Sequence, residues 1–241
     1  MKKTFPFILL FFFISNTNGQ QLDSISNHKK LSYKSFILPS ALIGSGALLL
    51  NSQFNRDNQE RSNSLFGSNF HTQVDNITVF MPLLQIYTGE LLGFDARHTI
   101  KHRTVDVVTA NALSYGLVTI LKNSVKSTRP DGSDQLSFPS GHTAIAFTNA
   151  ALLYQEYKDA NFWYASSGFV FATATGILRI ANNKHFSSDV LAGAGIGLAS
   201  GILVSYYNPL QKLHFGKKGT AFICPQFGNL IGIGTIIRPN F

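Results

Sequence analysis

The chain has 241 residues, which is enough for one sizeable domain with its own core. Only 13% of its residues are charged, against about a quarter in a typical soluble protein, and aromatic and small apolar residues replace them. This composition lies between that of a soluble domain and that of an integral membrane protein. The net charge of +8 suits anionic surfaces or phosphorylated substrates. No Lys/Arg-rich run or nucleic-acid motif accompanies this charge, so nucleic acid is not an expected partner.

Residues 1–19 have the pattern of a secretory signal peptide. Two lysines precede a ten-residue apolar run, Phe5–Ile14, and small residues follow at Thr17-Asn18-Gly19. The run is short for a membrane span, which needs about 20 residues, although an uncleaved anchor is the alternative. The sequence therefore predicts export, with a polar N-terminal arm over residues 20–35.

Six apolar segments rich in Ala, Leu and Gly follow, and their lengths favour helices over strands. They are Phe36–Leu50, Thr78–Phe94, Val105–Leu121, Thr143–Tyr157, Phe162–Ile180 and Val190–Tyr207. The sequence predicts an all-α fold, a helical domain over residues 36–215 built as a bundle of about six core helices. The Gly-rich run at residues 192–197 allows two helices to approach closely.

Two further segments depart from the apolar helical pattern. The connection Asn51–Asn76 is polar and is expected to hold a short surface helix or a lid. From Gly219 onward, β-branched residues flank a Phe227-Gly228-Asn229 turn, which predicts a short β-hairpin in the C-terminal tail, residues 216–241.

The first cluster of candidate site residues is a pair of cations, Lys122 and Arg129. On a helix they would lie two turns apart on one face, about 10 Å along the axis, and Pro130 would end that helix. Long side chains from both positions can converge on one anion. Alone, the pair is more typical of a helix C-terminus, where cations complement the dipole.

The second cluster is Pro139-Ser140-Gly141-His142, directly before an apolar helix. Ser140 suits the N-cap position, and Gly141 leaves backbone N–H groups open to an anion at the helix N-terminus. A cation in the first turn opposes the helix dipole. His142 is therefore better explained as a proton donor than as a packing residue.

The third cluster contains Arg179, His185 and Asp189. The last two are four residues apart at the start of a predicted helix, which places imidazole and carboxylate on one face. Asp189 can then fix the tautomer of His185, so that the other ring nitrogen presents its lone pair. In isolation, a surface His–Asp pair that caps a helix explains the spacing equally well.

Together, the clusters place three cations and two histidines within 68 residues. Lys-x6-Arg-Pro, Pro-Ser-Gly-His and Arg-x5-His-x3-Asp, in this order, resemble the signature of the type 2 phosphatidic-acid phosphatase superfamily. That superfamily also includes class A acid phosphatases and vanadium haloperoxidases. The resemblance implies a phosphatase that hydrolyses a phosphate ester of a lipid or small molecule without a metal or other cofactor.

By this resemblance, His185 would be the nucleophile that forms a phosphohistidine, and Asp189 would orient it. His142 would protonate the leaving oxygen and then activate water. The remaining matched groups would bind the phosphate oxygens: Lys122, Arg129, Ser140, Gly141 and Arg179.

Two departures from the family pattern concern the site. Leu178 stands where the third motif usually has Ser, which removes one hydroxyl contact. The loop between Pro130 and Pro139 is shorter than most relatives carry, which suggests an open leaving-group pocket. The motifs do not indicate which leaving group the enzyme accepts. Undecaprenyl pyrophosphate, lipid A phosphates, phosphatidic acid and small phosphomonoesters all present the same terminal phosphate.

Two alternative functions stay open. A vanadate-dependent haloperoxidase would use the same histidine, but this chain is too short for the extra helical elements of those enzymes. A catalytically silent envelope protein would keep the fold, but every catalytic residue type is present. The phosphatase interpretation is therefore preferred.

The cellular location follows from counting helices. Integral family members have six spans and a catalytic face outside the cytoplasm. If export leaves the N-terminus outside and each of the three predicted helices before Lys122 crosses the membrane, the site would instead lie in the cytoplasm. Several runs are only 15 to 17 residues long, and Gln85, Glu90 and Asp106 interrupt them. The sequence predicts a periplasmic or envelope-associated protein, either free or attached to a membrane surface, with an integral membrane protein as the alternative. It leaves the oligomeric state open.

One further pair of residues has metal-ligand spacing. His98 and His102 are at i and i+4, beside Arg97, Lys101 and Arg103. Because adjacent cations disfavour a divalent ion, the sequence predicts a solvated basic loop here rather than a metal site.

Overall fold

A computed structural model describes residues 31–208, 210, 220–226 and 232–238 of the chain. The expected signal peptide, most of the N-terminal arm and the Phe227-Gly228-Asn229 turn lie outside the described residues.

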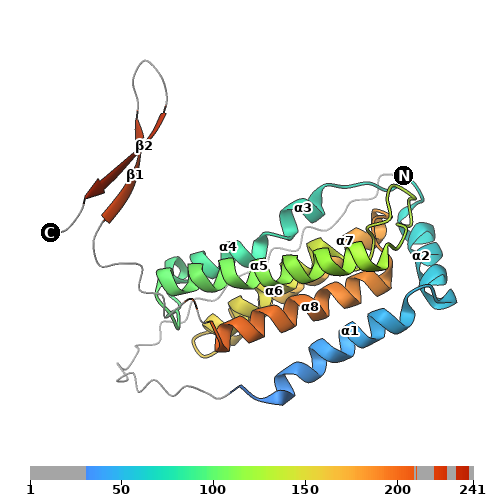
Figure 1. Ribbon diagram of the computed structural model, residues 1–241, viewed down its shortest axis with the longest axis horizontal. Coiled ribbons are helices and arrows are strands. Elements are labelled where there is room, and N and C mark those ends of the chain that lie inside the picture. The colour runs from blue at the N-terminus through green and yellow to red at the C-terminus, as the bar shows by residue number, and fades with distance from the viewer. Residues whose placement is uncertain (1–30, 209, 211–219, 227–231, 239–241) are drawn as a thin grey trace, which may run out of the picture. The chain divides into compact units, whose positions relative to one another are not determined.

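The described part of the chain is mainly helical, which confirms the predicted all-α fold. Its α-helices are α1 (Ile37–Leu49), α2 (Gln53–Phe66), α3 (Val74–Thr78), α4 (Met81–Thr88), α5 (Ile100–Val125), α6 (Gly141–Tyr157), α7 (Phe162–Ala181) and α8 (Ser187–Tyr206). Two 3-10 helices, Tyr33–Phe36 and Glu90–Leu92, precede α1 and follow α4. The long helices run in similar directions in Figure 1.

Helix α6 is the centre of the bundle. It contacts α3, α4, α5, α7 and α8, and α1 packs along α8. The buried face of α6 includes several small and aliphatic side chains, among them Ala146, Ala150 and Leu153, each 0% exposed. Small side chains allow neighbouring helices to approach this face closely.

The Gly-rich run of α8 produces such a close approach. A Cβ atom added to Gly197 would lie 2.3 Å from the carbonyl oxygen of Ala144 in α6. A Cβ atom on Gly193 would lie 2.5 Å from the carbonyl oxygen of Ser140. The predicted close packing of this segment is confirmed, and it brings the start of α8 against the start of α6.

Two predicted helices have wrong bounds. The segment 78–94 is divided between α3, α4 and a 3-10 turn, and Pro82 lies at the start of α4, where its missing N–H is tolerated. Helix α5 extends beyond the predicted Val105–Leu121 at both ends, and the charged Asp106 near its start is paired. Asp106 accepts a hydrogen bond from Asn208 Nδ2 at 2.6 Å.

The predicted solvated basic loop around residues 97–103 is also wrong in part. Arg103 is 2% exposed, and its guanidinium donates to the carbonyl oxygen of Ile86 and to Tyr157, both at 2.8 Å, and to Glu90 at 2.5 Å. His98 Nδ1 lies 2.8 Å from Glu156. These partners explain why the charges tolerate burial.

The polar connection between α1 and α3 holds a surface helix, as predicted. Helix α2 is bent by 92° from the preceding helical segment. Its buried residues are Asn55, Gln59 and Ser62, all polar. A polar inner face needs hydrogen-bond partners, and α2 finds them on α7, on α8 and on the connection between them.

The C-terminal tail forms the predicted hairpin. Strands β1 (Thr220–Gln226) and β2 (Gly232–Arg238) pair antiparallel, with Ile223 opposite Thr235.

Candidate active site

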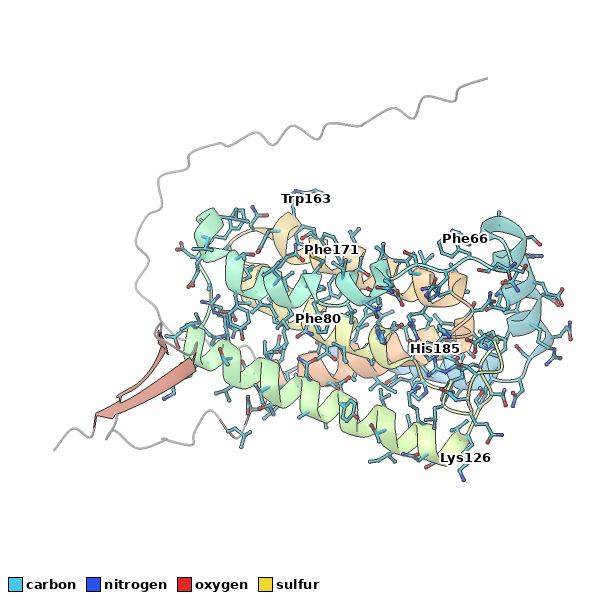
Figure 2. All side chains as sticks on the ribbon, turned by 90° about the horizontal axis from the view of Figure 1, so that it is seen from above. Phe66, Phe80, Lys126, Trp163, Phe171 and His185 are labelled. Atoms are coloured by element: carbon cyan, nitrogen blue, oxygen red, sulfur yellow. The ribbon has the colours of Figure 1, made fainter. Side chains whose placement is uncertain are left out.

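His185 lies in the connection between α7 and α8, two residues before α8 begins, so the expectation that it belongs to the helix is wrong. It is 2% exposed, and Figure 2 shows it toward the same end of the helices as Lys126 and Phe66. Its Nδ1 is 3.4 Å from Asp189 Oδ2, and its Nε2 is 3.3 Å from Arg129 Nη1. The first of these distances is loose for a hydrogen bond.

The contact with Arg129 indicates the tautomer of His185. A guanidinium group donates hydrogen bonds and cannot accept them, so the contact requires a lone pair on Nε2. The ring proton is then on Nδ1, which faces Asp189. Burial, opposed by Asp189, lowers the pKa of His185 to about 4, so the ring is neutral at pH 7.

Asp189 is fully buried and held by three donors. Its carboxylate accepts hydrogen bonds from Ser137 Oγ at 2.5 Å, from the backbone N–H of Phe186 at 2.9 Å and from Ser188 Oγ at 3.2 Å. The Phe186 bond also satisfies an N–H at the start of α8. These three donors fix the carboxylate beside the His185 ring.

Arg129 reaches this group from a loop, so its predicted place on a helix is wrong. Helix α5 ends at Val125, because Lys126 adopts a left-handed conformation with φ of 52°. Beyond it, Arg129 Nε donates to Asp134 at 2.8 Å and Nη1 donates to the carbonyl oxygen of Lys184 at 3.1 Å. These contacts orient the guanidinium between its own loop and the loop of His185.

Lys122 and Arg179 stand in the last turns of α5 and α7. Lys122 Nζ donates to the carbonyl oxygens of Leu136 and Ser137. Arg179 Nη1 donates to Asp75 at 2.7 Å. Both cations also act on the nucleophile candidate, because after burial their charges lower the pKa of His185 further.

The Pro-Ser-Gly-His segment has the predicted local structure. Ser140 is the N-cap of α6, which begins at Gly141, and Ser140 Oγ accepts from the hydroxyl of Thr143 at 2.9 Å. The Ser140 N–H donates to the backbone oxygen of Asp189 at 2.9 Å. This bond joins the second cluster to the third.

His142 lies in the first turn of α6, and its Nε2 is 3.1 Å from Asn76 Oδ1. Burial and then the charge of Arg179 lower the pKa of His142 below its usual value of 6.5, although Asp75 opposes them. Among the described residues, His142 makes no hydrogen bond to the group around His185.

The structure therefore gathers a neutral buried imidazole, a fixed carboxylate, three cations and a second imidazole at one end of the bundle. Such a site suits a group that carries negative charge and is attacked by nitrogen. The PAP2 superfamily model matches residues 103–212, which contain all three clusters. We call this matched part of the chain, residues 103–212, the PAP2 segment.

The chain is also similar to parts of two longer proteins. It is 39% identical over 152 residues to a lipid A 1-phosphatase of Porphyromonas gingivalis, a match that covers 62% of this chain and 34% of that protein. It is 37% identical over 79 residues to the bacitracin transport permease protein BcrC of Bacillus licheniformis, covering 33% of this chain and 36% of that protein. The chain thus spans about a third of the length of each of these two relatives.

Solved structures give a weaker similarity. The crystal structure of LpxE from Aquifex aeolicus aligns with a TM-score of 0.47 at 26% identity, over 61% of this chain and 94% of that chain. A PAP2-type phosphatidylglycerolphosphate phosphatase from Bacillus subtilis aligns with a TM-score of 0.48 at 18% identity, over 77% of this chain and 100% of that chain.

Several residues that contact the site lie before the PAP2 segment and were not predicted from the sequence. Asp75 holds Arg179, and Asn76 contacts His142. Asn55 exchanges two hydrogen bonds with Ser188, at 2.9 and 3.0 Å, next to Asp189. The only local signal for them is their place in a polar connection with few apolar residues.

Proposed function

We propose that the chain is a metal-independent phosphatase that hydrolyses a phosphate monoester of a lipid through a phosphohistidine on His185. The contact of Arg129 Nη1 with His185 Nε2 at 3.3 Å carries this proposal. It pairs a lone pair suited to attack with a guanidinium suited to bind the oxygens of the phosphate under attack. Asp189 on the other side stabilises the ring as it becomes positive.

The reaction has two steps. In the first, His185 Nε2 forms a bond to phosphorus, the bond from phosphorus to the leaving oxygen breaks, and His142 gives its proton to that oxygen. In the second, His142 removes a proton from water, the water oxygen attacks phosphorus, and the P–N bond breaks to release inorganic phosphate. Lys122, Arg129 and Arg179 stabilise the oxygens in both steps, and the Ser140 hydroxyl and the Gly141 N–H add neutral donors.

A lipid substrate is supported by the 39% identity to a lipid A 1-phosphatase and by the surface of the helices. Helices α5 and α8 are long and apolar enough to cross a membrane, and the bent pair of α1 and α2 would make a third such segment. These helices indicate a membrane protein, which favours the integral alternative over a soluble periplasmic domain. The signal-like residues 1–19 support export of the site to the outer side of the membrane.

The direct test is hydrolysis of phosphatidic acid in detergent micelles by the full chain, with and without EDTA. We expect phosphate release that EDTA does not change, and at least about a thousandfold loss of kcat in His185→Ala. The matched control is His102→Ala, an exposed histidine on α5, which should keep full activity. Metal-dependent activity, or full activity of His185→Ala, would contradict the mechanism.

The intermediate can be tested separately. We expect a base-stable, acid-labile phosphoryl group on His185 when the reaction is quenched in alkali, with ³²P-labelled phosphatidic acid as substrate. His142→Ala should accumulate it, because the second step lacks its base. Label retained in His185→Ala would place the intermediate elsewhere.

A further inference from the structure

The short helix α3 carries two consecutive residues that reach different groups of the candidate active site. Asp75 accepts a hydrogen bond from Arg179 on α7, and Asn76 Oδ1 lies 3.1 Å from Nε2 of His142 on α6. Neighbouring residues of a helix point about 100° apart, so a single turn serves both the cation and the second imidazole. This turn precedes the PAP2 segment.

Contacts on both sides of the turn fix the position of α3. Asn182 exchanges two hydrogen bonds with the backbone of Thr72, each of 2.9 Å. At the other end of α3, the Thr175 hydroxyl donates to the Thr78 hydroxyl at 2.8 Å. Asn76 is thus an exposed side chain on an anchored backbone, which is a suitable support for orienting a ring.

The contact between Asn76 and His142 defines which ring nitrogen is available for proton transfer. An amide oxygen accepts hydrogen bonds and cannot donate them, so His142 Nε2 carries the proton of this bond. The neutral ring then has its lone pair on Nδ1. In the protonated ring both nitrogens carry a proton, and the bond to Asn76 is kept. Within the part of the chain that the structure describes, the His142 ring makes no other hydrogen bond, so its Nδ1 is available to substrate and water.

Several charged groups act on the His142 ring from the elements around it. Burial lowers the pKa of His142, the charges of Arg179, Arg129 and Lys122 lower it further, and Asp75 opposes them. These are the three cations proposed to bind the phosphate oxygens, so the ring is close enough to serve the same phosphate. The Asn76 amide is neutral, and it therefore orients the ring without adding a charge that would raise this pKa.

We propose that Asn76 is a positioning residue, which holds His142 so that Nδ1 transfers the proton in both steps. In the first step the Nδ1 proton goes to the leaving oxygen as its bond to phosphorus breaks. In the second step Nδ1 takes a proton from the water whose oxygen attacks phosphorus. The Nε2–H bond to Asn76 is present throughout, so the ring keeps one orientation. This inference rests on the proposed phosphatase function and adds to it a residue outside the PAP2 segment.

The test compares two leaving groups on the full chain in detergent micelles. The substrates are dodecyl phosphate, whose alkoxide needs a proton to leave, and 4-dodecyl-2-nitrophenyl phosphate, whose nitrophenolate leaves without one. We expect Asn76→Ala to lower kcat/KM for the dodecyl ester by at least about tenfold, a part of the factor that a general acid contributes. The same variant should leave kcat/KM for the nitrophenyl ester within about twofold of wild type.

The second step gives a separate readout with the nitrophenyl ester. Because His142 is also the base for water, Asn76→Ala should lower kcat and KM together for this substrate. Rapid mixing should then show a burst of nitrophenolate that is stoichiometric with the protein, followed by slow turnover. A residue that only stabilised the fold would produce no such burst.

Two matched variants on the same turn separate this role from others. Gln73→Ala changes an exposed residue that makes no side-chain cap to α3, and it should behave as wild type with both substrates. Asp75→Asn acts on the phosphate through Arg179, so it should lower kcat/KM for both substrates by the same factor. Only Asn76→Ala should discriminate between the leaving groups.

Asn76→Asp tests the acceptor itself, because it keeps Oδ1 and removes the amide donor. It should restore hydrolysis of the dodecyl ester to within about threefold of wild type, since the ring is oriented again. The added carboxylate favours the protonated ring, so the alkaline limb of kcat/KM should move to higher pH. A loss as large as that of Asn76→Ala would contradict the proposed bond.

The outcomes distinguish this inference from the phosphatase proposal. Wild-type kinetics of Asn76→Ala, or an equal loss of kcat/KM on both substrates, would overturn the role of Asn76 and leave the phosphatase proposal intact. No hydrolysis of either ester by folded wild-type protein would overturn both.

Discussion

His185 lies between groups that control its charge in opposite ways. Asp189 favours the protonated ring, whereas burial and the nearby cations favour the neutral one, and the second influence prevails. A neutral ring keeps the lone pair that attack requires. Burial and then the same cations also lower the pKa of His142, so both histidines have a pKa below the usual value for a histidine.

These shifts predict a bell-shaped dependence of kcat/KM on pH. His185 must be neutral to attack, so activity rises through its pKa of about 4. His142 must be protonated to serve the leaving oxygen, so activity falls through its pKa, which lies below 6.5. We expect an optimum between these limits, measured with a soluble phosphomonoester from pH 3 to 9. A plateau that extends to pH 8 would contradict the assignment of His142 as the acid.

Asp75 supports the phosphate site through Arg179. It is 1% exposed, and its carboxylate accepts from Arg179 Nη1 at 2.7 Å. Asp75→Asn keeps the size of the side chain and removes the charge, so Arg179 should lose its orientation. We expect kcat/KM to fall by about 10- to 100-fold, the effect of one charge-assisted hydrogen bond, and competitive inhibition by vanadate to weaken in parallel. The control Asp95→Asn, in an exposed loop, should behave as wild type.

At the scale of elements, α2 holds the loop that carries His185. Asn55 contacts Ser188, and Gln59 donates to the carbonyl oxygen of Ile180 at 3.1 Å and to Asn183. Ser188 in turn donates to Asp189. A surface helix with a polar inner face thus supports the buried pair from outside the PAP2 segment.

Asn55→Ala should therefore reduce both stability and turnover. It leaves the backbone N–H of the buried Ser188 without its acceptor, which costs about 1–3 kcal/mol. We expect a lower thermal midpoint in detergent and a lower kcat with KM little changed, because the substrate-binding cations are untouched. The matched variant Asn58→Ala should change neither quantity. A normal kcat in a destabilised Asn55→Ala would show that the contact serves stability alone.

The interface between α6 and α8 depends on glycine. Gly197→Ala would place a methyl group 2.3 Å from the Ala144 carbonyl oxygen, so the helices must separate. We expect a cost of about 1–3 kcal/mol, measured as a lower thermal midpoint. Gly116 on α5 has no atom within 4 Å of an added Cβ, and Gly116→Ala should raise the midpoint slightly through helix propensity. Equal effects of the two variants would contradict the close packing.

At the scale of the whole molecule, helices α5 and α7 carry large exposed apolar side chains along their length. On α7, Trp163, Val170 and Ile177 are 82%, 67% and 50% exposed and lie seven residues apart, on one face. On α5, Val108 and Tyr115 are 62% and 65% exposed. Exposed apolar stripes on long helices fit a lipid environment.

We expect the full chain to stay in the membrane pellet after an alkaline carbonate wash, because a spanning helix cannot be released by charge repulsion. Asp or Lys placed at Tyr115, near the middle of α5, should reduce membrane insertion. The same residues at Ser124, an exposed polar position in the last turn of α5, should have less effect, because a charge near a helix end can reach water. Complete release by carbonate would favour a peripheral protein.

Local sequence was enough to predict the helices, the Ser140 cap, the Gly-rich contact and the identity of the clustered residues. These features depend on neighbours within one or two helical turns, which is the range over which caps and periodicity act. It predicted the place of Arg129 and the start of α8 incorrectly, because a left-handed Lys126 and the capping of α8 by Asp189 decide those boundaries.

The sequence by itself therefore determined the chemistry of the site: which cations, which two histidines and which carboxylate gather there. Only the tertiary structure decided what holds them and what lies beside them. Asn55 and Ser188 are 133 residues apart, and Asp75 and Arg179 are 104 apart. Contacts at such separations leave no local pattern, since they form only when packing around α6 brings the ends of distant helices together.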